Sequence, residues 1–187
     1  VPTGYAEAMK KYVDGGWIGL TMKEEFGGMG VPHTVGIACN EALSAASISF
    51  TMYPGLSAGA ANLIIDNCTE EQQAMFLEKM ISGEWGGTMC LTEAGAGSSV
   101  GDSKTKAEYV EGEEGWYKIT GQKIFISSGE HPMVENNIHL VLARAPGAPA
   151  GVKGLSIFLV PKYLVNEDGS KGEFNDVHCI GVEHKMG

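Results

Sequence analysis

A chain of 187 residues, 43% of them hydrophobic, is long enough to bury a core as one ordinary domain or two small ones. Thirteen Lys and Arg residues against 23 Asp and Glu give a formal net charge of -10, which opposes binding to the phosphate backbone of nucleic acid. The four cysteines are far apart and include no CxxC pair, which indicates reduced thiols in a cytoplasmic protein. His178, Cys179 and His184 lie close together but lack a fourth ligand, so we predict no metal site.

The first half of the chain, up to about residue 88, has the pattern of helices. The clearest is TEEQQAMFLEKMISG, residues 69–83, where Thr69 and Gln72 have the spacing of a capping box. An apolar stripe along this segment is formed by Phe76, Leu77, Met80 and Ile81. Upstream, Thr34 is placed to cap another helix.

Residues 42–65, ALSAASISFTMYPGLSAGAANLII, carry no charge and are numerous enough to raise the question of a membrane span. Serines, glycines and the central Pro54 dilute the apolar character of this stretch. We therefore reject a membrane span and predict two helices that are broken near Pro54 and buried in a bundle.

The second half alternates with a period of two, which predicts strands. GWYKITGQKIFISSG, residues 115–129, has the pattern of two strands about Gly121 and Gln122, and NIHLVLARA and GLSIFLVPK are two more. The segment AEYVEGEEGWY turns at residues 112–115. The prediction is an α+β protein whose second half is a small antiparallel barrel or sandwich.

Between the two halves lies the glycine-rich segment TMCLTEAGAGSSVG, residues 88–101. Its glycines miss the dinucleotide fingerprint by one residue, no βαβ unit surrounds them, and the Gly-Lys-Ser/Thr ending of a Walker loop is missing. Consecutive N–H groups and small side chains would suit an anionic or planar ligand. A tight interdomain turn explains the same residues equally well.

A second candidate segment is GQKIFISSGE, residues 121–130. A strand there places Phe125 and Ser127 on one face, while Ile124 and Ile126 point into a core. An aromatic wall with a hydroxyl beside it suits a flavin, which needs an apolar face and polar groups along its rim. For Phe125 taken alone, an ordinary place in the core is the simpler interpretation.

Four motifs in register, WIGLTMKEEFGGMG, MCLTEAGAGSS, YKITGQKIFISSGE and EHKMG, resemble the acyl-CoA dehydrogenase family. They span almost the whole chain. The sequence is most similar to the larger bacterial branch that includes the 3-methylmercaptopropionyl-CoA dehydrogenases, in its GEH after the second flavin segment and its LVPK strand. The resemblance implies that residues 1–88 belong to an N-terminal helical domain and residues 89–187 to an incomplete middle β domain. The family's C-terminal helical bundle is expected to be absent from this chain.

The resemblance also implies which residues hold FAD, in two flavin segments. In the first, Met89, Cys90, Leu91 and Thr92 would meet the pyrimidine edge, while Gly97 and Ser98 would lie by the pyrophosphate, with Ser98 also near CoA. In the second, Phe125, Ile126 and Ser127 would flank the ring system, with the Ser127 hydroxyl close to N5. Departures from the family pattern are Ala94 for Pro, Ser99 for Asp, Phe125 for Trp and Ser127 for Thr.

The activity implied by the resemblance is oxidation of an acyl-CoA to a trans-2-enoyl-CoA in fatty acid β-oxidation. Hydride would go to FAD N5 and the electrons to an electron-transferring flavoprotein. The family's catalytic base is a Glu in the bundle, so no catalytic residue is expected here and the chain alone is expected to be inactive. Glu93 is interpreted as an exposed or turn-anchoring carboxylate.

Two alternatives share the same flavin segments. One is an acyl-CoA oxidase that passes electrons to O2, and the other is an FAD-binding homologue without catalysis. In each case a homodimer or homotetramer in the bacterial cytoplasm is expected.

Overall fold

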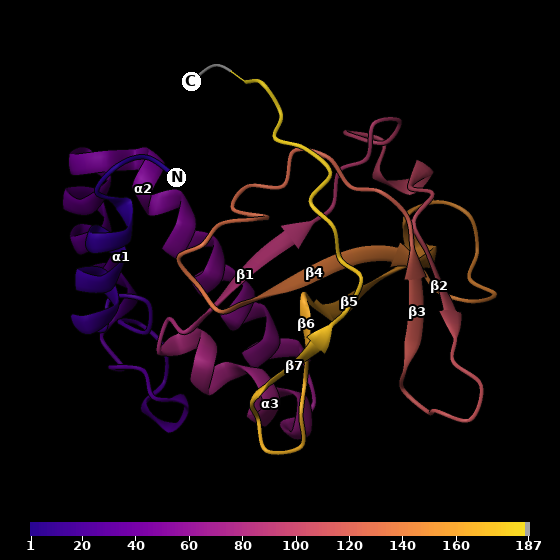
Figure 1. Ribbon diagram of the computed structural model, residues 1–187, viewed down its shortest axis with the longest axis horizontal. Coiled ribbons are helices and arrows are strands. Elements are labelled where there is room, and N and C mark those ends of the chain that lie inside the picture. Colours follow the sequence, from indigo (N-terminus) through magenta and orange to yellow (C-terminus); the bar gives the residue numbers. More distant parts are fainter. Residues whose placement is uncertain (186–187) are drawn as a thin grey trace. The chain divides into compact units, whose positions relative to one another are not determined.

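The computed structural model describes residues 1–185, so the last two residues of the EHKMG motif lie outside the described residues. The chain divides into two compact units. The first comprises residues 1–88, 127–138 and 161–178, and the second comprises residues 89–126, 139–160 and those from 179 onward. Helices come first along the chain and strands follow, as the sequence predicts (Figure 1).

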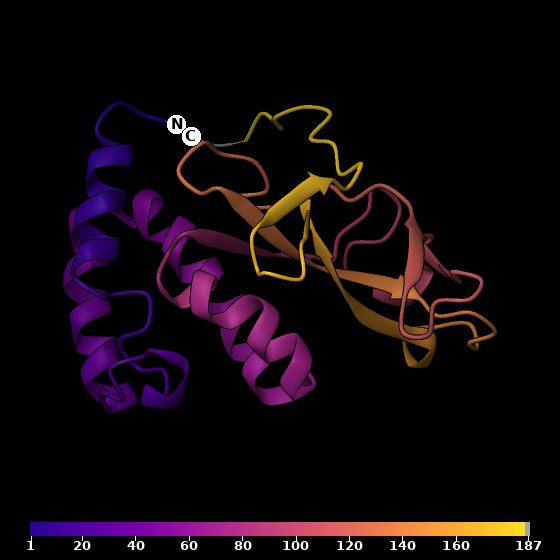
Figure 2. The same ribbon diagram turned by 60° about the horizontal axis from the view of Figure 1, so that its bottom comes forward.

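Three α-helices make up the N-terminal part of the first unit: α1 (Tyr5–Asp14), α2 (His33–Asn67) and α3 (Glu70–Ile81). Helix α1 lies alongside α2 in both views (Figures 1 and 2). The Tyr5 hydroxyl lies 2.6 Å from Ser49 Oγ, and the Tyr5 ring packs edge-on against Phe50 with centroids 5.6 Å apart. Aromatic contacts of this kind contribute about 0.5–1.5 kcal/mol beyond the area they bury.

Helix α3 forms as predicted. Thr69 is its N-cap, and the capping box with Gln72 is complete, since each side chain bonds the backbone N–H of the other residue. The predicted apolar stripe is buried along its whole length: Phe76, Leu77, Met80 and Ile81. Burying one such side chain stabilises the fold by about 1.5–3 kcal/mol, so the stripe fixes α3 in the core of the first unit.

Helix α2 breaks at Ser47, and the predicted break near Pro54 is wrong. Ser47 has non-helical φ and ψ of -163° and 98°, while Pro54 lies inside the helix and is buried. The break is stable because the Ser47 hydroxyl accepts the backbone N–H of Phe50 at 3.3 Å, as an N-cap does for the helix that follows. Thr34 does not cap α2, which begins after Pro32 without a side-chain cap.

By length and composition alone, α2 could cross a membrane. Core helices of soluble proteins pass the same test, so the finding is weak evidence for a span. The buried residues of α2 follow the helical repeat, as on one face packed against a core: Phe50, Pro54, Ser57, the adjacent pair Ala60 and Ala61, and Ile64.

The main sheet has the strand order β1 (Trp85–Cys90), β4 (Asn136–Arg144), β2 (Lys106–Tyr109), β3 (Tyr117–Thr120). Strand β5 (Leu155–Pro161) also pairs with β4. Strand β4 is buried along almost its whole length, because it has neighbours on both sides and carries the run Ile138 to Ala143. The predicted strands at NIHLVLARA and GLSIFLVPK are therefore confirmed.

The sheet is mixed rather than purely antiparallel. Strands β2 and β3 form the predicted hairpin, in which Ala107 opposes Ile119, and Gly112 and Gly115 turn the chain with positive φ. Strands β2 and β4, however, run parallel, with Lys106 opposite Arg144. Within the described residues this sheet stays open and does not close into a barrel. The expected order of a helical part followed by a β part is confirmed.

A second small sheet pairs β6 (Tyr163–Val165) with β7 (Lys171–Phe174). This hairpin was not predicted from the sequence, because each strand is only three or four residues long. Its signal was the Asp168-Gly169 pair, which commonly marks a hairpin turn, and Gly169 has a φ of 78°.

The strand predicted over residues 121–127 is absent. Phe125 has a φ of 61°, in the left-handed region, which no regular strand contains. The backbone N–H of Ile124 bonds the carbonyl of Thr92 in a single link rather than a ladder. The predicted alternation nevertheless survives in the burial, because Phe125 and Ser127 are exposed while Ile124 and Ile126 are half-buried.

Candidate flavin site

The first predicted flavin segment begins at the end of β1. The pleat of the strand exposes Met89, 37% accessible, and buries Cys90. Leu91 and Thr92 are half-buried beyond the strand end. An exposed methionine at a strand end leaves an apolar surface available to a flat ligand.

A tight turn follows the strand. Glu93 and Ala96 exchange two backbone hydrogen bonds, of 3.2 and 3.0 Å, which closes the loop. Beyond it, Gly97 and Ser98 are exposed, and their backbone N–H groups donate to no protein atom within residues 1–185. A Cβ added at Gly97 would meet nothing within 4 Å. Two adjacent open N–H groups fit an anionic group such as a pyrophosphate.

The second predicted segment, residues 121–130, carries the predicted flavin residues Phe125, Ile126 and Ser127. The Phe125 ring is 51% exposed, an unusual position for an aromatic side chain with only apolar atoms. The ammonium of Lys185, from the EHKMG motif, lies 5.1 Å from the centroid of that ring. Three of the four motifs contribute residues to the second unit. Two of them, YKITGQKIFISSGE and EHKMG, meet at Phe125.

The two predicted segments are joined directly. The backbone N–H of Ile124 donates to the carbonyl of Thr92 at 2.9 Å, and the ammonium of Lys123 donates to the carbonyl of Leu91 at 3.1 Å. The second segment is thus bonded to the first at two consecutive carbonyls. The two segments were predicted from the sequence, whereas the hydrogen bonds that join them are seen only in the structure.

Glu93 anchors the turn of the first segment. It is 8% exposed, and its carboxylate accepts hydrogen bonds from the side chains of Ser103, Thr105 and Lys123 and from the backbone N–H groups of Lys104 and Thr105. Burial acts to raise the pKa of this carboxyl. The hydrogen bonds outweigh burial and hold the pKa of Glu93 well below its ordinary value. Of the two interpretations of Glu93, the turn-anchoring one is therefore the one that the structure supports.

Two basic residues that were not predicted from the sequence bind groups in and around this turn. Lys123 pairs with Glu93 at 2.9 Å, and both side chains are 9% exposed. Arg144, at the end of β4, donates to the carbonyls of Gly101 and Gly151 at 2.8 and 3.1 Å. The signal for Lys123 was a charge placed directly before the apolar run Ile124 to Ile126.

The Cys90 side chain lies on the buried side of β1. Its sulfur is 3.8 Å from Nδ1 of His139, and both residues are buried. If Cys90 contributes to a ligand site on the exposed side, it does so through its backbone groups.

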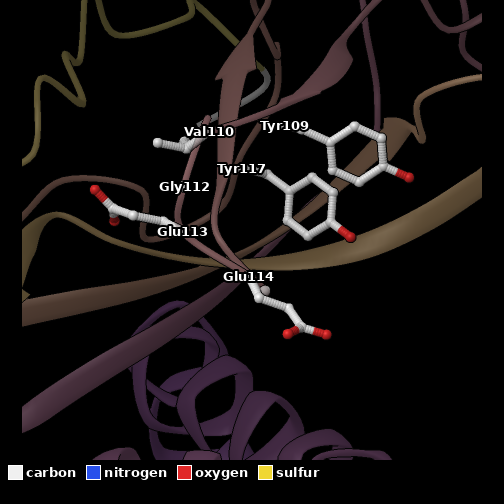
Figure 3. A pocket seen from close by; sticks show the side chains of 7 residues that line it. Tyr109, Val110, Gly112, Glu113, Glu114 and Tyr117 are labelled. Atoms are coloured by element: carbon white, nitrogen blue, oxygen red, sulfur yellow. The ribbon is translucent and has the colours of Figure 1, made fainter.

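An open depression of about 470 Å³ lies at the β2–β3 hairpin (Figure 3). Its walls are formed by the rings of Tyr109 and Tyr117 and by the turn that carries Glu113 and Glu114. None of the predicted flavin residues lines it. Over residues 1–185, no group of three or more His, Cys, Asp and Glu side chains is placed to hold a metal ion.

Comparisons with known proteins agree with this architecture. The acyl-CoA dehydrogenase N-terminal domain matches residues 2–84, and the acyl-CoA dehydrogenase middle domain matches residues 88–175. The 3-methylmercaptopropionyl-CoA dehydrogenase of Ruegeria pomeroyi is 45% identical over 187 residues, which is 100% of this chain and 32% of the relative.

Solved structures show the same fold. An acyl-CoA dehydrogenase of Bacillus anthracis complexed with FAD matches with a TM-score of 0.72 and 27% identity, over 85% of this chain and 26% of that one. A chain from the structure of the electron transferring flavoprotein of Acidaminococcus fermentans matches with a TM-score of 0.71 and 28% identity, over 83% of this chain and 39% of that one.

The order of elements and the two domain matches define the class as the helical N-terminal and β middle domains of an acyl-CoA dehydrogenase. The chain belongs to the acyl-CoA dehydrogenase family. It spans about a third of the length of the Ruegeria relative, 32%. The resemblance inferred from the four motifs is confirmed.

Proposed function

We propose that the full-length protein is an FAD-dependent dehydrogenase that oxidises an acyl-CoA to a trans-2-enoyl-CoA. The observation that carries the proposal is the joining of the two flavin segments through Thr92 and Ile124, beside the exposed side chains of Met89 and Phe125. The FAD complex of the Bacillus anthracis relative supports FAD as the cofactor. When bound, FAD supplies the hydride acceptor for the reaction.

The residues of this chain would bind and orient the cofactor. Apolar contact would come from Met89 and Phe125, which are exposed although neither carries a polar group that favours water. The unengaged N–H groups of Gly97 and Ser98 would donate to the pyrophosphate, and Ser98 would also lie near CoA. Leu91, Ile126 and the backbone of Cys90 are also predicted to contact the cofactor.

Hydroxyl groups would fix the polar rim of the ring system. Thr92 is half-buried, its carbonyl accepts the N–H of Ile124, and its hydroxyl would meet the pyrimidine edge. Ser127 is exposed and would offer its hydroxyl near N5. A hydroxyl both donates and accepts, so one side chain can serve either kind of group on the rim.

The base that removes the α-proton would come from outside this chain. A general base must accept a proton near neutral pH, and this requires a carboxyl whose pKa is raised. Glu93 has the opposite property, because its hydrogen bonds lower its pKa, and both of its carboxylate oxygens are occupied. It is suited to holding the turn and unsuited to proton transfer.

For the full-length protein we further propose an electron-transferring flavoprotein as electron acceptor, a role in fatty acid β-oxidation, a homodimer or homotetramer, and a cytoplasmic location. The chain alone would be inactive. Neither an oxidase nor a homologue without catalysis is favoured by a specific feature of the described residues.

The test uses the full-length protein purified without denaturants. It should retain FAD, reduce it on addition of an acyl-CoA, and transfer electrons to an electron-transferring flavoprotein faster than to air. Rapid peroxide formation on mixing the reduced protein with air would make it an oxidase. Bound FAD that no acyl-CoA reduces would make it a homologue without catalysis.

A further inference from the structure

Lys123 bridges the two flavin segments by a side chain that the sequence motifs leave unexplained. Its backbone lies two residues before Phe125, in the second segment, while its ammonium donates to the carbonyl of Leu91 in the first at 3.1 Å. The same ammonium donates to Glu93 Oε1 at 2.9 Å and to Ser103 Oγ at 3.2 Å. One cation thus satisfies three acceptors within a single site.

The contact with Glu93 extends the bridge into the sheet. The Glu93 carboxylate is also bound by the backbone N–H of Thr105, at 3.0 Å, and by the N–H of Lys104, at 2.7 Å. These residues directly precede β2, so the carboxylate is fixed to the start of that strand. The Lys123 ammonium is therefore held against a rigid partner.

The backbone next to Lys123 is strained at Phe125. Its φ of 61° lies in the left-handed region, which is disfavoured for a residue that carries a β-carbon. Such a conformation persists only where neighbouring contacts hold it. The contacts on its N-terminal side are the Ile124 bond to Thr92 and the bridge made by Lys123.

We propose that Lys123 is a positioning residue that fixes Phe125 relative to Leu91 and Thr92, and thereby sets the affinity of the full-length protein for FAD. The inference rests on the proposed function, since it assumes that these two segments bind the cofactor. Lys123 is not among the residues predicted to contact the flavin, and its ammonium bonds Leu91, Glu93 and Ser103, so it would act through the segments that it joins. Removal of its charge would let the Phe125 backbone relax and separate the two segments.

The test is a titration of the full-length apoprotein with FAD, in which the quenching of flavin fluorescence reports binding. The variant is K123M. Methionine keeps the length of the side chain and removes the cation. Glu93 retains hydrogen bonds from Ser103, Thr105 and Lys104, so we expect the variant to fold. Lys118→Met, an exposed lysine on β3 of the same unit, is the matched control.

We expect K123M to raise the Kd for FAD about tenfold, which corresponds to about 1.4 kcal/mol. The visible circular dichroism of the bound flavin should change, because this signal reports the placement of the ring by its neighbours. K118M should match the wild type in both measurements, and K123R, which keeps the charge, should fall between the wild type and K123M. A role confined to folding would lower the melting temperature of the apoprotein and leave the Kd and the dichroism unchanged.

Wild-type Kd and dichroism in K123M would overturn the inference while leaving the proposed function intact. A wild-type protein that takes up no FAD would overturn both. Should K123M fail to fold, Ser103→Ala becomes the deciding variant, since it removes one hydroxyl that bonds both Glu93 and Lys123. We expect S103A to weaken FAD binding about threefold, because both hydrogen bonds of this hydroxyl are lost while the contact between Lys123 and Glu93 remains, and an unchanged Kd would overturn the inference.

Discussion

The backbone N–H of Ile124 donates a 2.9 Å hydrogen bond to the carbonyl oxygen of Thr92. This bond joins two segments that are far apart in the sequence, and it does so at the residue before Phe125, whose ring is 51% exposed. An exposed aromatic ring beside a fixed carbonyl is an arrangement suited to contact with a ligand.

Replacement of Phe125 by Ala in the full-length protein should weaken FAD binding about tenfold. This matches the upper end of the free energy of an aromatic contact, about 0.5–1.5 kcal/mol beyond the area that it buries. Fluorescence titration of the apoprotein measures the change. Tyr109→Ala removes another exposed ring of the same unit, 70% accessible, and should leave the Kd unchanged. Equal Kd values for F125A and the wild type would show that Phe125 does not contact the cofactor.

Glu93→Gln should make the stability of the protein less dependent on pH in the acid range. A carboxyl with a lowered pKa in the folded state stabilises the fold above its unfolded pKa, about 4.3, and loses that contribution as the pH falls further towards the folded value. At neutral pH, E93Q should cost about 3–5 kcal/mol, because Lys123 loses its buried partner.

Melting temperatures of the full-length protein from neutral pH downward measure this effect, with Glu113→Gln on the exposed hairpin turn as control. The wild type and E113Q should lose stability together as the pH falls below about 4.3, while the difference between the wild type and E93Q narrows. A difference that stays constant over this range would contradict the assignment of a lowered pKa to Glu93.

Gly121→Ala should destabilise the second unit. A Cβ at this position would lie 2.3 Å from Thr105 Oγ1 and 2.8 Å from Thr105 Cα, and the backbone atom cannot move aside cheaply. We expect a loss of about 1–3 kcal/mol, the usual cost of overpacking. Gly59→Ala, in α2 with nothing within 4 Å of the added Cβ, should instead stabilise its helix by about 1 kcal/mol. Denaturant unfolding of both variants measures the change in the free energy of unfolding, which should fall for G121A and rise for G59A. Equal changes in the two variants would contradict this expectation.

The sequence predicted the regular parts of this fold from local patterns. The capping box at Thr69, the β2–β3 hairpin and the buried run in β4 all depend on residues that are neighbours in the chain. The break of α2 escaped prediction because Pro54 is held inside the helix, while the interruption lies seven residues earlier at Ser47, whose hydroxyl caps the helix that follows.

The candidate site also has features that could be predicted from the sequence and features that could not. Its segments could be identified from motifs, and the alternation between Phe125 and Ile126 predicted which side chain is exposed. The left-handed φ of Phe125 and the bridge from Lys123 to Glu93 could not be predicted, since both depend on contacts between distant parts of the chain. The parallel pairing of β2 with β4 is non-local for the same reason.

Thr69→Ala should cost about 1 kcal/mol, the usual loss when an N-cap threonine is removed. Hydrogen exchange of the first turn of α3 in the full-length protein should accelerate, because the N–H of Gln72 loses its acceptor. Thr34→Ala is the matched control, since Thr34 lies in the first turn of α2 without capping it. Equal exchange in the T69A variant and the wild type would contradict the importance of the cap.

The flavin segments are tested most directly by the visible absorption spectrum of the full-length protein after purification without denaturants and without added cofactor. We expect a flavin spectrum with FAD bound in stoichiometric amount, which is released on denaturation and identified as FAD by its chromatographic mobility. A protein without flavin absorption that also fails to take up added FAD would contradict it.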